Sequence, residues 1–202
     1  MQVKLRATLA VLLRGSVVEQ TGEYRIGAAP DAVWDALNDP AVLAQCIDGC
    51  ETMTRDGEDS YAAKVKAKVG PVRATFDTSL QLTDIQPPTS YTINANLKGG
   101  AAGFGKGVAR VSLAGDGADT VLSYSVQGNV GGKLAQVGSR LIDATARKMA
   151  DDFFSAFGEL VAPGHVEKVA VPGEEPGYEK SGSWIIWIVV FAVLVLAIVL
   201  AW

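Results

Sequence analysis

YAAKVKAKVGPVRATFDTSLQL, residues 61–82, decides the fold, because small or apolar side chains alternate with polar ones along it. In its first half the polar positions are lysines: Lys64, Lys66 and Lys68. Gly70 and Pro71 then form a turn sequence, after which the same period of two resumes. The stretch therefore predicts a long antiparallel hairpin with one buried face and one solvated face.

The alternation continues on both sides of this hairpin. On the C-terminal side, three further strands are predicted around residues 91–97, 109–113 and 122–130. On the N-terminal side, residues 22–26 predict a strand, and two short helices follow before the turn at Asp48 and Gly49. The sequence thus predicts six or seven strands in meander order.

A long helix is expected after the last strand. Residues 133–157 return to helical spacing, with most apolar side chains on one side and most charged ones elsewhere. A helix of this length spans about 37 Å, enough to cross a whole sheet. We therefore predict an α+β helix-grip fold, in which a curved antiparallel sheet wraps around a long C-terminal helix.

The expected folded domain occupies residues 20–158. Residues 1–19 are expected to form an unstructured extension; they superficially resemble a signal peptide but lack an A-x-A cleavage site. Residues 159–183 contain several prolines and glycines with scattered Glu and Lys, which predicts a flexible linker.

Residues 184–202, WIIWIVVFAVLVLAIVLAW, form an uninterrupted charge-free run. A helix of this length is about 28 Å long, close to the roughly 30 Å hydrocarbon core of a bilayer. Trp184, Trp187 and Trp202 lie near its ends, where indoles prefer the headgroup layer. With Lys180 before the run, we expect a single-pass C-terminal transmembrane anchor in the cytoplasmic membrane, with the domain on the cytoplasmic side.

The domain offers little catalytic or metal-binding chemistry. The single histidine, His165, falls in the expected linker, which leaves no histidine for a general base or a triad. Cys46 and Cys50 lack histidine partners for a zinc site and are expected to pack as reduced thiols. The net charge of −4, without a Lys/Arg run, argues against a nucleic-acid partner. We expect no catalytic residue and no metal.

GGAAGFGKG, residues 99–107, has the glycine and lysine spacing of a phosphate-binding loop. Its context argues against that function, because Gly107 replaces the magnesium-binding Ser or Thr and a strand follows where a helix is needed. Two interpretations remain: a mobile flap with Phe104 at its tip, or a plain loop between strands.

The predicted inner face of the sheet combines aromatic with small side chains. Small neighbours include Ala63, Ala67, Ala74, Ala95, Ala109 and Gly128. A close-packed core needs larger partners, so we expect a cavity for an apolar ligand beneath the helix; the alternative is a helix that settles closer and fills the space. The candidate ligand-binding residues are Phe76, Leu80, Tyr91, Ile93, Phe104, Tyr124, Leu141, Thr145 and Met149.

Five segments carry a family resemblance: VWDALNDP at 33–40, CIDGC at 46–50, KVGPV at 68–72, GGAAGFGKG at 99–107 and VGGKLAQVGSRLID at 130–143. Through them, residues 22–157 resemble the CoxG family of carbon monoxide dehydrogenase accessory proteins, within the START-like (SRPBCC) superfamily. Asp48 departs from the family, which usually has proline there.

This resemblance implies the same helix-grip fold and a nonenzymatic role. It implies a partner, a molybdenum-containing CO dehydrogenase or a related hydroxylase recruited to the cytoplasmic membrane. It also implies a hydrophobic ligand, a respiratory quinone such as menaquinone or ubiquinone, and no covalent cofactor. The alternatives are a pure membrane anchor without a ligand and a START-like cyclase or hydratase.

Overall fold

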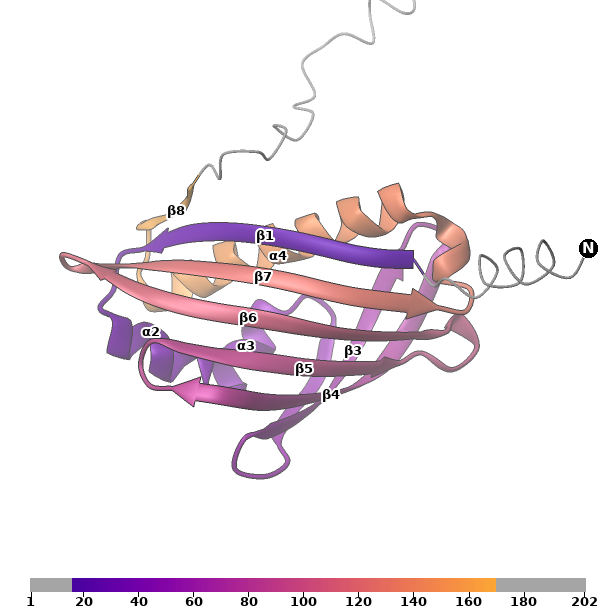
Figure 1. Ribbon diagram of the computed structural model, residues 1–202, viewed down its shortest axis with the longest axis horizontal. Coiled ribbons are helices and arrows are strands. Elements are labelled where there is room, and N and C mark those ends of the chain that lie inside the picture. Colours follow the sequence, from indigo (N-terminus) through magenta and orange to yellow (C-terminus); the bar gives the residue numbers. More distant parts are fainter. Residues whose placement is uncertain (1–15, 170–202) are drawn as a thin grey trace, which may run out of the picture. The chain divides into compact units, whose positions relative to one another are not determined.

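The structure, a computed structural model, describes residues 16–169 of the chain. One strand and two helices precede the main run of strands, and a long helix and a short strand follow it (Figure 1). The elements are β1 (Ser16–Ile26), α2 (Pro30–Leu37), α3 (Pro40–Cys46), β2 (Cys50–Arg55), β3 (Ser60–Val69), β4 (Val72–Gln86), β5 (Ser90–Lys98), β6 (Phe104–Asp116), β7 (Asp119–Gly131), α4 (Ser139–Val161) and β8 (Val166–Val169).

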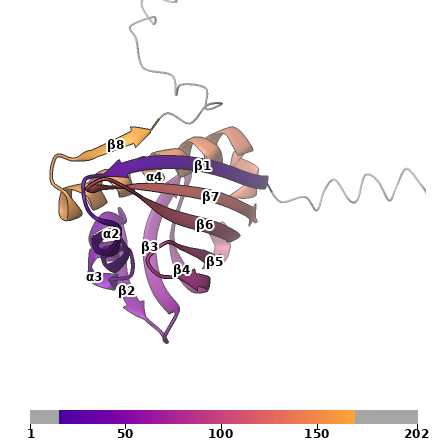
Figure 2. The ribbon, with the colours of Figure 1, turned by 60° about the vertical axis from the view of Figure 1, so that its left-hand side comes forward.

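All the strands belong to one antiparallel sheet in the order β2-β3-β4-β5-β6-β7-β1-β8. The hairpin predicted from residues 61–82 is confirmed: Val69 pairs with Val72 at its turn, and Ala67 pairs with Ala74. Figure 2 shows the sheet curving from β1 round to β4, with α4 on its concave side. The predicted helix-grip architecture is therefore present, with β2 as a strand that the alternation did not predict.

The C-terminal half of α4 is fixed to the sheet by aromatic rings. Phe154 stacks on Tyr24 of β1 with ring centroids 4.1 Å apart, and Tyr124 of β7 lies 5.5 Å from the same ring. Phe157 and Ile26 are completely buried beside them. These rings fix the C-terminal half of the helix on the sheet. They thereby also determine where its N-terminal half lies over β3 and β4.

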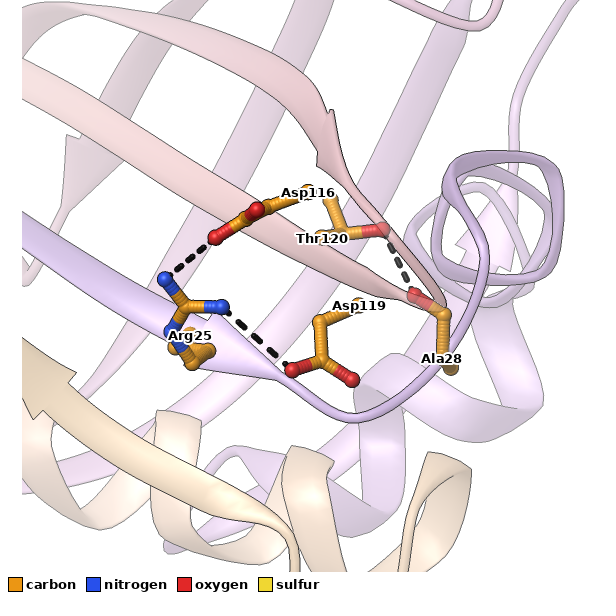
Figure 3. Close-up of polar contacts among 5 residues, drawn as sticks. All are labelled: Arg25, Ala28, Asp116, Asp119 and Thr120. Atoms are coloured by element: carbon orange, nitrogen blue, oxygen red, sulfur yellow. Dashed lines mark hydrogen bonds and ion pairs between the residues drawn. The ribbon is translucent and has the colours of Figure 1, made fainter.

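Polar contacts hold the corner between β1 and α2 to the β6–β7 turn (Figure 3). Arg25 forms ion pairs with Asp116 and Asp119, and hydrogen bonding to Asp116 raises the pKa of its guanidinium. The buried Thr120 hydroxyl donates a hydrogen bond of 2.7 Å to the carbonyl oxygen of Ala28. The chain therefore enters α2 from a fixed position.

Three predicted boundaries are corrected. Residues 16–19 belong to β1, where they pair with β7, so the extension ends before Ser16. Gly138, at a φ of 95°, delays the start of the long helix from 133 to 139. Residues 159–169 are not linker, because α4 continues to Val161 and β8 pairs with β1.

The remaining predictions at the two ends of the chain lie outside the described residues. These are the extension over 1–15, the linker over 170–183 and the transmembrane anchor over 184–202. Between residues 16 and 169, none of the helices has both the length and the apolar character needed to cross a bilayer.

Gly158 tests how β8 is attached to the long helix. It is buried, and a Cβ placed on it would overlap the side chain of Val166 in β8. Gly158→Ala should lower the free energy of unfolding by about 1–3 kcal/mol through overpacking, although alanine favours helices. Chemical denaturation measures this. The exposed Ser155→Ala on the same helix should stay within about 0.5 kcal/mol of the parent; equal effects of the two substitutions would contradict the overlap.

Candidate functional site

A cavity of about 1010 Å³ lies between α4 and the inner faces of β3, β4 and β5. Its wall on the sheet is made largely of small side chains, and α4 and the loop after α3 complete it. The sheet contributes Ala63, Ala67, Ala74, Ala95, Phe76, Leu80 and Leu97, and also Met53, Val65, Lys66, Lys68, Arg73, Thr75 and Thr78; α4 contributes Thr145, Lys148, Met149, Ala150, Asp152 and Phe153; the loop contributes Ile47 and Asp48. The cavity predicted from the small inner-face residues is present.

Two contacts keep α4 from settling onto the alanines. Its C-terminal half is held by the stacked rings of Tyr24 and Phe154. Near its other end, Leu141 packs against Gly70 at the β3–β4 turn, where a Cβ would meet the leucine side chain. Between these supports the paired Ala67 and Ala74 are too short to fill the gap. The structure thus excludes the filled alternative.

Four of the nine candidate ligand-binding residues line this cavity: Phe76, Leu80, Thr145 and Met149. The other five lie elsewhere, and the prediction that they line the cavity is wrong: Tyr91, Ile93, Phe104, Tyr124 and Leu141. The structure explains why each of these five residues lies outside the cavity wall.

Tyr91, Ile93 and Tyr124 do face inward, as their alternation predicts, but they lie beyond the cavity along their strands. Tyr91 and Ile93 pack in a cluster with Tyr61, and the ring of Trp34 meets Tyr91 edge-on at 5.4 Å. Tyr124 belongs to the aromatic group under the C-terminal half of α4. Alternation therefore identified the face of each residue but not its distance from the cavity.

Phe104 and Leu141 lie at the end of the sheet where α4 begins. Phe104 opens β6, is 50% exposed, and lies over Gly131 of the neighbouring strand. The segment before it contains a short 3-10 turn, Gly100–Ala102, and both interpretations of this connection stay predictions. Leu141 is 41% exposed and closes the cavity end against Gly70.

The exposed lining residues form a charged mouth. Lys148 and Asp152 of α4 form an ion pair one helical turn apart, and Asp48 lies in the facing loop. The hydrogen bond from Lys148 to Asp152 raises the pKa of the lysine, and the charges of Asp48 and Asp151 raise it further. Asp48 and Lys148 lie in distant parts of the sequence that no periodicity connects, so sequence analysis did not place them together at the mouth.

One polar group in the wall is unsatisfied. The hydroxyl of Thr78 is buried and has no hydrogen-bond partner within residues 16–169. Thr78 lies between Ala63 and Leu97 on neighbouring strands and contributes to the cavity wall. By contrast, the Thr145 hydroxyl donates a 2.7 Å hydrogen bond to the carbonyl oxygen of Leu141. Because a buried unpaired hydroxyl costs free energy, Thr78 is the polar group of the wall that a ligand would satisfy.

The described residues offer weak nucleophiles. Cys46 and Cys50 are free thiols, and burial raises the pKa of each, which favours the protonated form. Burial likewise raises the pKa of the Tyr91 phenol. Across residues 16–169, no three His, Cys, Asp or Glu side chains gather where they would hold a metal ion. The geometry is that of a binding cavity.

Two kinds of comparison give matches for this chain. The sequence profile of the family described as the CoxG subunit of carbon monoxide dehydrogenase matches residues 22–162. A conserved protein from Geobacillus kaustophilus, known from its crystal structure, is 30% identical; the match covers 75% of this chain and 100% of that chain, with a TM-score of 0.66. A search among curated proteins gives no match.

Two more distant structures share the fold alone. A START superfamily protein from Mycobacterium smegmatis is 15% identical, with 73% of this chain and 97% of that chain covered and a TM-score of 0.54. The Zhui aromatase/cyclase from Streptomyces sp. R1128 is 12% identical, with 74% and 99% covered and the same TM-score of 0.54. They are consistent with a START-like fold built around a long helix.

Thr78→Val tests the unsatisfied hydroxyl. The substitution replaces the hydroxyl by a methyl group of similar size, so the free energy of unfolding of the ligand-free protein should rise by about 1 kcal/mol. The measurement is denaturant unfolding. Thr145→Val, on the opposite wall, removes a paired hydroxyl and should give no gain; a similar gain from both variants would show that general hydrophobicity is responsible.

Proposed function

The chain belongs to the CoxG family of carbon monoxide dehydrogenase subunits, and from this we propose that it is a nonenzymatic, membrane-anchored accessory protein. In this proposal it recruits a molybdenum-containing CO dehydrogenase, or a related hydroxylase, to the cytoplasmic membrane. It also binds a hydrophobic ligand, a respiratory quinone such as menaquinone or ubiquinone, between the sheet and α4.

The cavity is the single observation that carries the ligand part of the proposal. Its volume of about 1010 Å³ is at the upper end of the range of about 300–1,000 Å³ typical of small-molecule sites. Alanines and larger apolar side chains make up much of its wall, and its charged lining residues are Asp48, Lys148 and Asp152 from α4 and the facing loop and Lys66, Lys68 and Arg73 from the sheet. An elongated apolar molecule with a few polar atoms suits this distribution.

A quinone also suits the polar groups of the wall. Its ring is flat and apolar, and its carbonyl oxygens accept hydrogen bonds. The hydroxyl of Thr78, which has no hydrogen-bond partner within residues 16–169, is the donor proposed for such an oxygen. Because a quinone leaving a bilayer gains little hydrophobic free energy, shape and such polar contacts must provide the selectivity.

The nonenzymatic part rests on the chemistry of the wall. The cavity-lining carboxylates are Asp48 and Asp152, both at the mouth, and Asp152 is paired with Lys148. His165 lies near β8, where its ring nitrogen contacts the carbonyl oxygen of Pro163, away from the cavity-lining residues. A cyclase shares this fold at 12% identity, which concerns the fold alone.

Filling the cavity tests ligand binding. Ala95→Phe should occupy the space beneath α4 and abolish co-purification of a prenylated quinone with the full-length protein, as measured by native mass spectrometry from detergent-solubilised membranes. Asn96→Phe is the matched control, because Asn96 is the next residue on β5 and lies on the other face of the sheet. It should keep the bound quinone.

Two outcomes would contradict the carrier function. One is a parent protein that carries no prenylated lipid and binds no quinone after reconstitution. The other is an Ala95→Phe protein that supports dehydrogenase recruitment and respiration as fully as the parent does, which would favour the pure anchor. A carrier predicts that Ala95→Phe retains recruitment but loses electron transfer to the respiratory chain.

Removal of residues 184–202 tests the anchor separately. A chain ending at residue 183 should fold like the parent but move from the membrane to the soluble fraction at high salt, because the proposed span is absent and salt screens contacts between surface charges and lipid. Cell fractionation with immunodetection measures this, and the thermal unfolding midpoint controls for folding. Unchanged membrane-coupled CO oxidation by the shortened chain would contradict the anchoring function.

A further inference from the structure

One end of the sheet carries a cluster of exposed basic side chains from separate parts of the chain. It is the end where β1 and α4 begin and where β7 finishes, on the right in Figure 1. The strand registers place the β3–β4 turn and the β5–β6 connection there as well. The cluster, here called the basic end, consists of Lys68, Arg73, Lys98, Lys106, Lys133 and Arg140.

The charges of the basic end are not neutralised within residues 16–169. None of the six forms an ion pair there, whereas Arg25, Lys64, Lys66, Lys148 and Lys168 all do. The nearby carboxylates include Glu19, Asp77 and Asp143, of which Asp77 is paired with Lys64, and Asp48 lines the same cavity as Lys68 and Arg73. This end is therefore positive although the whole chain has a net charge of −4.

The opposite end of the sheet has the opposite charge. The β2–β3, β4–β5 and β6–β7 turns lie there, and Arg25 and Arg55 are their nearby cations. Their acidic residues are Asp56, Glu58, Asp59, Asp84, Asp116 and Asp119. The domain is thus positively charged at one end of its strands and negatively charged at the other.

Exposed apolar side chains accompany the cations at the basic end. Val17, Phe104 and Leu141 are 57%, 50% and 41% exposed. Phe104 pairs directly with Lys98, and Leu141 follows Arg140 in the first turn of α4. Basic side chains interspersed with exposed Phe and Leu are typical of surfaces that bind the headgroup layer of a bilayer.

We propose that the basic end docks the folded domain on a bilayer rich in anionic phospholipid. The cations would bind the phosphates, while Val17, Phe104 and Leu141 enter the headgroup layer. The position of Leu141 favours lipid over an acidic protein as the partner of the basic end. Leu141 also closes one end of the cavity against Gly70, so docking through Leu141 brings that end of the cavity to the lipid. The contact is separate from the proposed anchor, and the choice of lipid as its occupant rests on the ligand-binding part of the proposed function.

Hydrogen–deuterium exchange of the full-length protein tests the docking. The protein is reconstituted into vesicles of phosphatidylcholine alone or mixed with phosphatidylglycerol, so that any tail insertion is common to both. Amides of residues 99–103 and 132–138 should be protected in the anionic vesicles, less so in phosphatidylcholine, and high salt should remove the difference.

A matched pair of variants localises the contact. Lys106 and Arg110 are both exposed on the same face of β6, four positions apart, but only Lys106 belongs to the basic end. Lys106→Gln should lower the docking equilibrium about fivefold, and Lys98→Gln/Lys106→Gln/Lys133→Gln together about a hundredfold. Arg110→Gln should leave it unchanged. All these side chains are exposed, so thermal unfolding should not change.

Several results would overturn the proposal. Equal protection in both kinds of vesicle, absence of protection in the anionic ones, or an equal effect of Lys106→Gln and Arg110→Gln would each do so. Protection that appears only when a molybdenum hydroxylase is added, irrespective of the lipid, would assign the basic end to a protein partner instead.

Discussion

The structure depends on the aromatic contact between the C-terminal half of α4 and strand β1. Tyr24 and Phe154 stack at 4.1 Å, and Phe153 continues the group by meeting Phe154 edge-on and stacking with Phe157 at 5.9 Å. Aromatic rings in such contact contribute about 0.5–1.5 kcal/mol per pair beyond the burial of their area. The group holds one end of the helix firmly enough that its other half need not pack tightly.

The rest of the helix and the part of the sheet beneath it can then enclose a cavity. Leu141 supports the N-terminal part of α4 on Gly70, and the intervening turns stand over alanines. The C-terminal half of α4 thereby stabilises the fold, while the turns before it cover the cavity. Protein interiors are normally close-packed, so a cavity of about 1010 Å³ requires such supports on both sides.

Much of this arrangement follows from local patterns in the sequence. The period-two segment at 61–82 predicted its hairpin, and alanines at alternating positions predicted the cavity, because both depend only on which face a residue occupies. The failures at Tyr91 and Tyr124 share one cause. Tyr91 and Tyr124 face inward as predicted, yet they pack away from the cavity, since the crossing point of α4 is a property of the tertiary structure.

The basic end and the mouth were hidden from sequence analysis for a related reason. Lys68, Lys98 and Lys133 are about 30 residues apart in the chain and form no run, and only the meander brings them to one end. Strand β8 was missed because its four residues lie inside the stretch predicted as linker and give too short a pattern. Its pairing with β1 is a long-range contact that local periodicity does not reveal.

The alanine wall has a consequence for how such a protein diversifies. Ala63, Ala67, Ala74 and Ala95 contribute little to the core clusters that hold α4, so exchanges among small residues there reshape the cavity at small cost in stability. Related proteins could thus bind ligands of different shape through substitutions in this wall while they keep the same aromatic contacts between α4 and β1.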